Sequence, residues 1–300
     1  MRSKLSRGAG GSADKGAPAL PAGLYLVATP IGNLGDISRR ALEVLRRADR
    51  IACEDTRVTR KLLSAEGIAT PTTAYHDHSG PRERRRLLDA VAAGAAIAVV
   101  SDAGTPLVSD PGFKLVREAI EAGLPVTALP GPSAPLVALL LSGLPSDRFF
   151  FGGFLPAKSG ARRQALQDLA GLDASLIFFE GASRVAASLA DMAAVLGDRE
   201  AAVARELTKL HEEVRRGGLA ELAAHYEEAG APKGEIVIVV GPPAPQEAGE
   251  GFDLDAALAE ALKHGSLRDA AATVAAASGL PRRRVYARAL ELAKREGGEP

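Results

Sequence analysis

Short apolar runs alternate with helical patterns between residues 24 and 141, and this alternation constrains the fold more than any other feature of the chain. A strand-length run occurs five times, at residues 24–28, 50–54, 72–75, 95–100 and 125–129. Each run leads into a turn and then into a helical pattern, as Ile37, Ala41 and Leu45 show after the first run. Strands separated by helices pair in parallel, so the pattern predicts a parallel α/β sheet with helices on both faces.

The spacing changes after residue 143. Residues 144–241 contain further strand and helix patterns, but the strand-like segments at residues 201–205 and 212–215 are not separated by a helix. Since neighbouring strands without a helix between them pair antiparallel, we predict a second α/β domain with a mixed sheet. Residues 242–251 have the proline and glycine content of a linker.

A small basic helical domain is predicted at residues 252–300, with helical patterns at 254–262, 267–277 and 284–294. From Lys263 to Arg295 the charges sum to +6 when histidine is neutral. The turn at residues 278–281 gives the last two helices the spacing of a helix-turn-helix, which suits nucleic acid. The alternative is a structural appendage that caps the second domain or forms a dimer contact.

Composition excludes several classes of protein. The 37 basic and 37 acidic residues cancel, so a nucleic-acid surface has to be local. Cys53 is the only cysteine, which excludes an internal disulfide and fits a reducing cytoplasm. Residues 1–22 lack the apolar core of a signal peptide and are predicted to be a disordered tail. No apolar run approaches the roughly 20 residues that span a bilayer, so we expect a cytoplasmic protein with no membrane partner.

Residues 101–112, with the sequence SDAGTPLVSDPG, are the strongest candidate for a ligand-binding loop. Glycine permits a positive φ and close approach of the backbone to a ligand, whereas proline stiffens the loop. Open α/β sheets bind ligands at the carboxyl ends of their strands, where this segment begins. An ordinary strand-to-helix turn is the alternative, although such turns are usually shorter, about 2–6 residues. The segment PGPS at residues 130–133 is a second rigid turn at a strand end.

Polar side chains follow two further strands. The segment EDTR at residues 54–57 offers two carboxylates, a hydroxyl and a guanidinium. It is either a site or a solvated turn with an ion pair worth about 0–1 kcal/mol. The next strand leads into His76, Asp77 and His78, which suggest a metal. Three adjacent residues cannot close a metal site alone, so we expect no metal and favour loop polarity or substrate contact.

Eight segments together carry a resemblance to a known family: TPIGNLGD (29–36), EDTR (54–57), residues 101–112, PGPS (130–133), GLPSDR (143–148), GFLPAK (153–158), RELTK (205–209) and KGE (233–235). In this order and spacing, residues 23–295 resemble the tetrapyrrole methylase superfamily, the class III methyltransferases. Within it they are similar to the branch that methylates small-subunit ribosomal RNA. The first segment departs from tetrapyrrole-methylating relatives, whose substrate-side loop there is rich in glycine, and this argues against a tetrapyrrole substrate.

The resemblance implies two α/β domains, residues 23–143 and 144–241, with a cofactor cleft between them, followed by the small C-terminal helical domain. It implies S-adenosylmethionine as cofactor and 2′-O-methylation of a cytidine ribose in small-subunit (16S) ribosomal RNA. The partner would be the naked RNA or the assembled small ribosomal subunit, and the protein would be a homodimer. The residues that match the family's cofactor-binding loops are Asp102, Ala103, Gly104, Thr105, Pro106, Ser109, Asp110, Gly131, Pro132, Ser133, Glu206, Leu207, Gly234 and Glu235.

In such an enzyme the sulfonium of the cofactor already activates the methyl group, so the protein mainly has to hold the ribose hydroxyl in line with it. Positioning can supply roughly 7–11 kcal/mol, whereas a general base adds about 10²–10⁴-fold. The candidates to accept the hydroxyl proton are Asp55, His76, Asp77 and Glu180. The candidates for contact with RNA phosphate or ribose are Arg57, Arg84, Lys158, Arg184, Lys209, Arg282, Arg283 and Arg284.

Two other functions remain open from the sequence. One is a small-molecule methyltransferase of the same fold that acts on a tetrapyrrole-like precursor, although a basic helical domain has no evident use in such an enzyme. The other is a non-catalytic helix-turn-helix protein that binds nucleic acid and uses its α/β part to sense a ligand. Methyl transfer to ribosomal RNA distinguishes the enzyme from the sensor.

Overall fold

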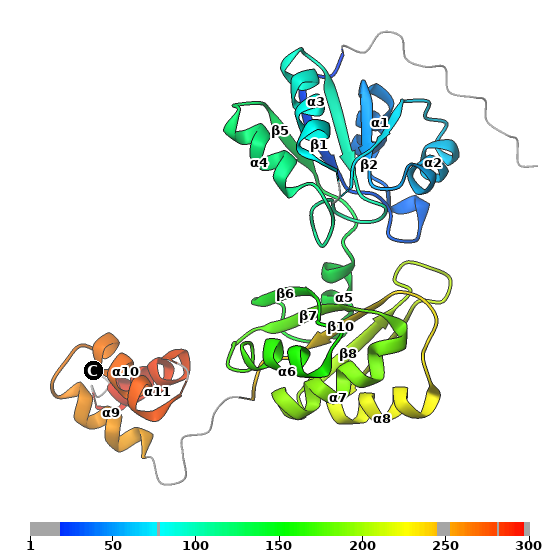
Figure 1. Ribbon diagram of the computed structural model, residues 1–300. Helices are drawn as coiled ribbons and strands as arrows, with labels where there is room; N and C mark the ends of the chain where they lie inside the picture. The colour runs from blue at the N-terminus through cyan, green and yellow to red at the C-terminus, as the bar shows by residue number, and fades with distance from the viewer. Residues whose placement is uncertain (1–18, 77–78, 245–252, 281, 297–300) are drawn as a thin grey trace, which may run out of the picture. The chain divides into compact units, whose positions relative to one another are not determined.

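The computed structural model describes residues 19–76, 79–244, 253–280 and 282–296 (Figure 1). The chain divides into two compact units: unit 1 comprises residues 1–138 and 205–213, and unit 2 comprises residues 139–204 and 214–300. The sequence patterns place the first boundary at residue 143 and give no sign that residues 205–213 return to unit 1. A segment from the second half of the chain therefore contributes to the first unit.

Unit 1 is built on a five-stranded parallel sheet with the strand order β3-β2-β4-β1-β5. Its strands are β1 (Gly23–Val27), β2 (Arg50–Cys53), β3 (Thr72–Ala74), β4 (Ala96–Val100) and β5 (Val126–Leu129). All residues of β4 are buried, because this strand lies in the middle of the sheet and carries apolar side chains on both faces. The observed sheet confirms the parallel α/β fold that the alternation predicts.

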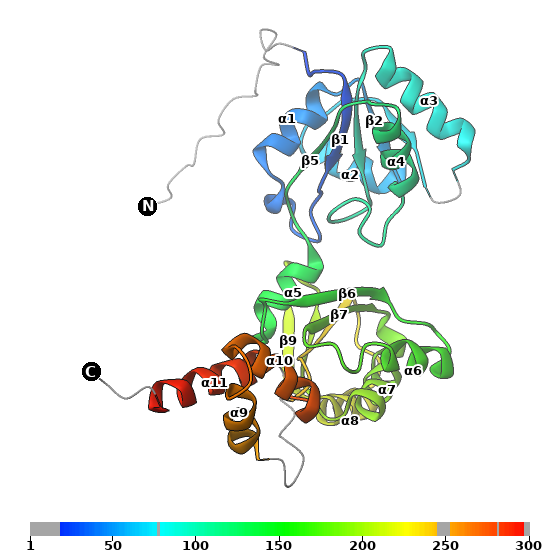
Figure 2. The same cartoon turned by 90° about the vertical axis from the view of Figure 1, so that its left-hand side faces the viewer.

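Helices cover both faces of this sheet (Figures 1 and 2). They are α1 (Arg39–Arg47), α2 (Thr56–Ala65), α3 (Pro81–Ala92) and α4 (Phe113–Glu121), with a short 3-10 helix η1 (Leu34–Asp36) after β1. Helices α1 and α2 share an apolar cluster with Ala98 of β4, whereas α3 and α4 share another with Ile97. Since neighbouring residues of a strand point to opposite faces, the two clusters lie on opposite sides of the sheet.

Unit 2 contains a five-stranded mixed sheet with the order β6-β7-β10-β8-β9. Its strands are β6 (Phe149–Phe154), β7 (Ser175–Glu180), β8 (Glu200–Arg205), β9 (Glu213–Gly218) and β10 (Ile236–Val240). Strand β6 pairs in parallel with β7 and β10 pairs antiparallel with it, which confirms the predicted mixed sheet. One apolar core joins β7, β8 and β10 to the helices α6 (Ser159–Gln167), α7 (Val185–Leu196) and α8 (Leu219–Ala229). Helix α5 (Ala134–Ser142) precedes β6, and a 3-10 helix η2 (Ala182–Arg184) precedes α7.

Three helices near the C-terminus, α9 (Leu254–Leu262), α10 (Leu267–Ser278) and α11 (Arg282–Glu296), pack on one another. Leu258, Val274 and Val285, one from each helix, are buried in a shared apolar cluster. The three helices predicted for this region are therefore confirmed. No helix in the described part of the chain combines the length and the apolar character that a bilayer crossing needs.

Candidate active site

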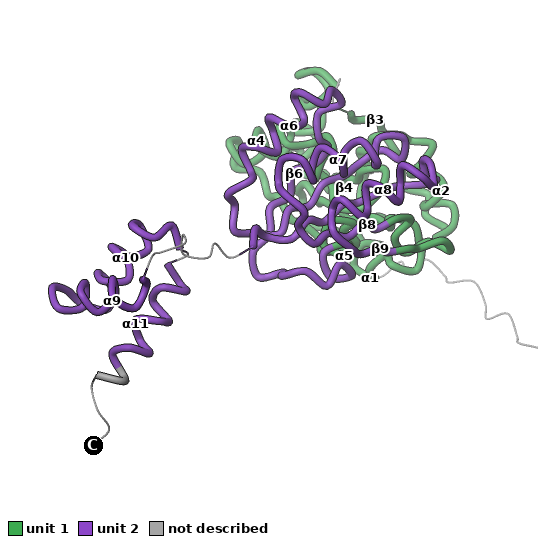
Figure 3. Tube along the Cα trace, turned by 90° about the horizontal axis from the view of Figure 1, so that it is seen from below, with its two compact units in different colours: residues 1–138, 205–213 green, residues 139–204, 214–300 purple. Residues whose placement is uncertain are grey.

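Four segments meet at the carboxyl edge of the unit 1 sheet. Residues 29–36 follow β1, residues 101–112 follow β4, and residues 130–133 follow β5. Because β1 lies between β4 and β5, the three loops leave the sheet side by side. The fourth segment, residues 205–213, belongs to the same unit and has the same colour as the rest of it in Figure 3.

Hydrogen bonds fix the three strand-end loops to one another. The Thr29 amide donates to the Gly104 carbonyl oxygen at 2.9 Å, and the Gly104 amide donates to the Thr29 carbonyl oxygen at 3.0 Å. The Thr105 hydroxyl donates to the carbonyl oxygen of Pro132 at 3.1 Å. Each such bond contributes only about 0.5–1.5 kcal/mol, but together they hold the loops as one surface.

Gly104 lies at the centre of this arrangement. Its φ is +74°, in the left-handed region, and a Cβ atom there would lie 3.3 Å from Cγ2 of Ile31. A larger side chain would therefore be strained by its own backbone and would press on the first loop. This close approach is the structural reason for a glycine in the middle of the predicted ligand loop.

Residues 205–213 pack against the first loop at Gly32. A Cβ atom on Gly32 would overlap the aliphatic part of Lys209 and lie 3.1 Å from the carbonyl oxygen of Leu207. Ion pairs hold the segment in shape: Lys209 Nζ lies 2.9 Å from Glu206 Oε1, and an Arg205–Glu213 pair closes the segment at its two ends. Glu206 and Leu207, which the family resemblance assigns to cofactor binding, thus lie beside the strand-end loops.

Backbone strain is concentrated in two of the four segments. Among the described residues, the non-glycine residues with positive φ are Leu107 (72°), Ser109 (62°), Glu206 (50°) and Thr208 (64°). Each such residue costs of the order of 1–3 kcal/mol, and strain of this kind clusters at ligand sites. The Thr208 hydroxyl is also buried and has no hydrogen-bond partner among the described residues. Residues 101–112 and 205–213 therefore carry the strongest structural signs of a ligand site.

Asp55 is engaged as a helix cap and ion-pair partner. Its carboxylate accepts a hydrogen bond from the Arg57 amide at 2.8 Å and pairs with the Arg57 guanidinium at 2.7 Å. The hydrogen bonds from Arg57 lower the pKa of Asp55 to about 2. A carboxylate this acidic is a weak base, which argues against Asp55 as the proton acceptor. Its amide donates to Asp102 Oδ1 at 2.9 Å and so ties the start of α2 to the loop after β4.

Glu180, another candidate proton acceptor, is a buried structural residue of unit 2. Its side chain is 1% exposed and pairs with Arg184 at 2.7 Å. The Ser188 hydroxyl and the Gly181 amide donate to its two carboxylate oxygens. With both oxygens occupied and no exposure to solvent, Glu180 is poorly placed to take a proton from a substrate.

Of the two remaining candidates, His76 follows β3, at the same edge of the unit 1 sheet as the loops. His76 is exposed, and its amide donates to the Ser79 hydroxyl oxygen at 2.9 Å. Asp77 lies outside the described residues. Among the residues that the structure describes, no group of three or more His, Cys, Asp or Glu side chains could hold a metal ion.

Unit 1 brings most of the predicted cofactor residues together. They are Asp102, Ala103, Gly104, Thr105, Pro106, Ser109 and Asp110 after β4, Gly131, Pro132 and Ser133 after β5, and Glu206 and Leu207 in residues 205–213. Gly234 and Glu235 precede β10 in unit 2. The part of all these residues in cofactor binding stays a prediction. Sequence reasoning missed the strained residues Leu107 and Thr208, because these residue types carry no signal for a left-handed conformation.

The predicted RNA-contact residues fall into different environments. Arg84 has a side chain only 12% exposed and pairs with Glu118 at 2.7 Å, so it joins α3 to α4. This geometry gives Arg84 a structural role and argues against contact with RNA. The other candidates keep at least part of their surface open to solvent: Arg57, Lys158, Arg184, Lys209, Arg282, Arg283 and Arg284.

The family of the chain follows from comparison with known proteins. Residues 23–223 match the family model described as Tetrapyrrole (Corrin/Porphyrin) Methylases, and residues 249–293 match a model described as RsmI C-terminal HTH domain. The chain therefore belongs to the tetrapyrrole methylase family.

Curated relatives point to one branch of that family. The chain is 52% identical to Ribosomal RNA small subunit methyltransferase I of Mesorhizobium japonicum, over 91% of this chain and 93% of the relative. It is 56% identical to the protein of the same name from Erythrobacter litoralis, over 93% of this chain and 98% of the relative.

Solved structures share the fold at lower identity. Diphthine synthase has a TM-score of 0.57 at 18% identity and covers 73% of this chain and 89% of its own. Cobalt precorrin-4 methyltransferase has a TM-score of 0.54 at 16% identity and covers 73% of this chain and 94% of its own. At these identities the likeness establishes the fold alone.

The packing of Lys209 on Gly32 makes a testable prediction. In Gly32→Ala the new methyl group displaces the Lys209 chain and loosens residues 205–213, so the amides of this segment should exchange hydrogen at least about tenfold faster, equivalent to roughly 1.4 kcal/mol. Hydrogen–deuterium exchange with mass spectrometry measures this rate. Gly171→Ala, where an added Cβ meets nothing within 4 Å, is the control. Unchanged exchange in Gly32→Ala would contradict the packing.

Proposed function

We propose that this protein uses S-adenosylmethionine to methylate the 2′-hydroxyl of a cytidine in small-subunit (16S) ribosomal RNA. The observation that carries the proposal is the identity of 52% and 56%, over more than nine-tenths of the chain, to relatives named Ribosomal RNA small subunit methyltransferase I. The arrangement of the loops in unit 1 supports it, because they form the constrained, partly strained surface that a bound cofactor requires.

The residues of unit 1 fit a cofactor of this kind. Gly104 presents its backbone without a side chain, and the Thr208 hydroxyl is a buried donor without a partner among the described residues. Residues 101–112, 130–133 and 205–213 would hold the cofactor. When bound, S-adenosylmethionine supplies a methyl group activated by its sulfonium.

The task left to the chain is to position the ribose and to remove a proton from its hydroxyl. With Asp55 paired to Arg57 and Glu180 buried, we propose His76 and Asp77 as the remaining candidates for the proton acceptor. His76 follows β3, the edge strand next to β2, and so lies at the carboxyl edge of the sheet, where the loops lie, and Asp77 is the next residue in the sequence.

The C-terminal helices offer a surface suited to RNA. Arg268, Arg282, Arg283 and Tyr286 line a shallow hollow between α10 and the start of α11. The first turn of α11 has no acidic residue, so its arginines oppose the helix dipole at a cost of about 0.3–1 kcal/mol each. A bound phosphate removes that cost, and an exposed tyrosine ring can stack on a base. Arg288, by contrast, is paired with Asp255 and Glu291.

We also propose that the protein acts as a cytoplasmic homodimer on the naked RNA or on the assembled small subunit. Exposed phenylalanines on the edge strand β6, among them Phe149 and Phe154, are consistent with an interface between copies.

Transfer of labelled methyl groups tests the proposed function. Small ribosomal subunits and naked 16S RNA are prepared from cells that lack this protein and incubated with the protein and methyl-labelled S-adenosylmethionine. The expected product is one labelled cytidine whose 3′ phosphodiester bond resists alkaline cleavage, as a 2′-O-methyl group requires. Label on a base, label on a tetrapyrrole only, or no transfer to either RNA substrate would overturn the proposal.

Gly104→Val is expected to weaken S-adenosylmethionine binding at least tenfold, which corresponds to about 1.4 kcal/mol. The valine combines a φ of +74° with contact to Ile31 and so displaces the loop after β4. Gly123→Val is the matched control, since Gly123 has a φ of +67° but no atom within 4 Å of an added Cβ. Calorimetric titration measures the affinity of both. Equal affinity of Gly104→Val and wild type would remove this loop from the cofactor site.

Replacing Arg282 and Arg283 by glutamine is expected to weaken RNA binding without changing cofactor affinity. For single-stranded RNA the slope of log affinity against log salt should become less negative by about 0.7 for each lost phosphate contact. Fluorescence anisotropy at several salt concentrations measures the slope. Lys263→Gln, which removes an exposed charge already paired with Glu260, is the control. A slope identical to that of wild type would exclude these arginines from RNA contact.

A further inference from the structure

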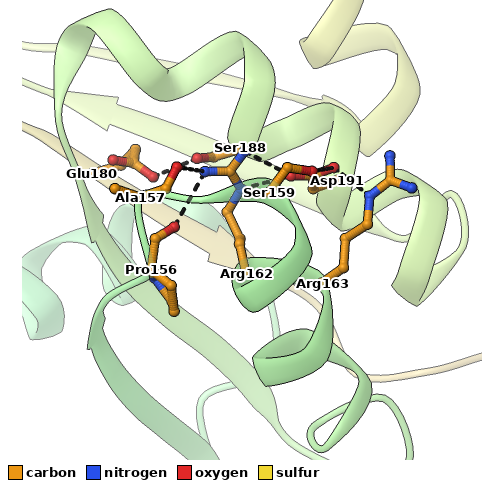
Figure 4. A network of polar contacts seen from close by, with 8 residues as sticks. All are labelled: Pro156, Ala157, Ser159, Arg162, Arg163, Glu180, Ser188 and Asp191. Carbon is orange, nitrogen blue, oxygen red and sulfur yellow. Dashed lines mark hydrogen bonds and ion pairs between the residues drawn. The ribbon is translucent and has the colours of Figure 1, made fainter.

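Two carboxylates in unit 2 are buried and held in a similar way, and the first is Asp191 on α7 (Figure 4). Its side chain is 5% exposed. One oxygen accepts hydrogen bonds from the Ser159 hydroxyl at 3.0 Å and from Arg163 Nε at 2.6 Å. The other accepts from Arg162 Nε at 2.7 Å. These bonds lower the pKa of Asp191 in spite of the opposing effect of desolvation, so it is ionised at neutral pH.

The second carboxylate is Glu180 at the end of β7. Like Asp191, it accepts a hydrogen bond from a serine hydroxyl, here that of Ser188 (Figure 4). Its other oxygen accepts from the Gly181 amide and pairs with Arg184 at 2.7 Å. Each buried carboxylate therefore accepts a hydrogen bond from a serine hydroxyl and pairs with one arginine that reaches the surface.

Each of those two arginines contacts its carboxylate and keeps part of its side chain exposed to solvent. Arg163 is 54% exposed and Arg184 is 32% exposed. Arg163 uses Nε to contact Asp191, and its two terminal nitrogens point away from the network (Figure 4). A guanidinium offers donors on two edges, so the outer edge of Arg163 remains able to bind a phosphate through two hydrogen bonds.

Charge neutralisation does not account for Arg163. Arg162, also 5% exposed, already balances Asp191 one to one within the buried pair. Arg163 adds a second positive charge and leaves the group of three with a net charge of +1. Such an excess charge at a surface is expected where an anion binds.

The same network fixes the turn that carries a further cation. Arg162 donates to the carbonyl oxygens of Pro156 at 3.3 Å and Ala157 at 3.1 Å (Figure 4). These residues directly precede Lys158, which is exposed at the start of α6. The buried pair of Arg162 and Asp191 thus fixes the conformation of the backbone that carries Lys158 and Arg163.

We propose that Arg163 and Arg184 contact phosphodiester groups of the RNA substrate, and that Asp191 and Glu180 are positioning residues that hold the two guanidinium groups before the RNA arrives. Side chains fixed in advance lose less conformational entropy on binding, so each contact favours binding more than a mobile arginine would. This inference rests on the proposed function, because it takes the RNA of that reaction as the ligand.

The test compares Arg163→Gln and Arg184→Gln with wild type. Each variant is expected to raise the KM for the RNA substrate about tenfold with kcat unchanged, and to make the salt slope of RNA binding less negative by about 0.7. Arg148→Gln is the matched control, since Arg148 is also on unit 2 but pairs with Asp173 on the open surface, where both side chains are more than half exposed. Cofactor affinity should be unchanged in all three variants.

Arg163→Lys tests the positioning by Asp191. Lysine keeps the charge but has no second edge to present once it contacts Asp191, so the KM should stay raised. Restoration of the wild-type KM by lysine would overturn the positioning role, and a wild-type KM and salt slope in both glutamine variants would overturn the phosphate contacts.

RNA binding is measured separately by anisotropy with small-subunit RNA and with inorganic phosphate as competitor. Absence of methyl transfer by wild-type protein would therefore contradict the proposed function, whereas unchanged RNA binding by the variants would contradict this inference alone.

Discussion

The parallel pairing of β4 with β1 and β2 is the constraint on which the site in unit 1 depends. Because β4 is buried along its whole length and its neighbours run in the same direction, the loops that follow β1, β2 and β4 emerge at one edge. Beyond the strands, the two hydrogen bonds between Thr29 and Gly104 form an isolated antiparallel bridge that holds two of these loops together. Every other contact in the candidate site builds on this arrangement.

Different parts of unit 1 provide its stability and its candidate ligand site. Apolar clusters on both faces of the sheet hold the strands, whereas residues 101–112 and 205–213 contain the left-handed residues other than glycine among those described. A packed core tolerates such strain because its own burial outweighs a few kcal/mol, of the order of 1–3 for each strained residue. The loops can therefore keep a conformation suited to a ligand rather than the one of lowest local energy.

The arginines also fall into two groups: some join neighbouring elements of the structure, and others keep an exposed side. Arg84 and Arg162 are almost fully buried and join neighbouring elements, and Arg288 links α11 to an aspartate of α9. Arg163 and Arg184 are held by buried carboxylates but keep an exposed side. The sequence shows the same residue type in all five positions, so it predicted Arg84 and Arg184 alike as RNA contacts. Burial, which depends on which helices pack together, separates them.

The sequence by itself determined the class of fold, the mixed second sheet, the C-terminal helices and the loop at residues 101–112. Those features follow from periodicity and from glycine and proline, which act within a few residues of the chain. Only the tertiary structure decided that residues 205–213 join unit 1, that Glu180 is buried, and that Thr208 takes a left-handed conformation in which its hydroxyl has no partner in the described part of the chain. These depend on contacts between residues distant in sequence, such as Lys209 with Gly32, and no local pattern encodes such contacts.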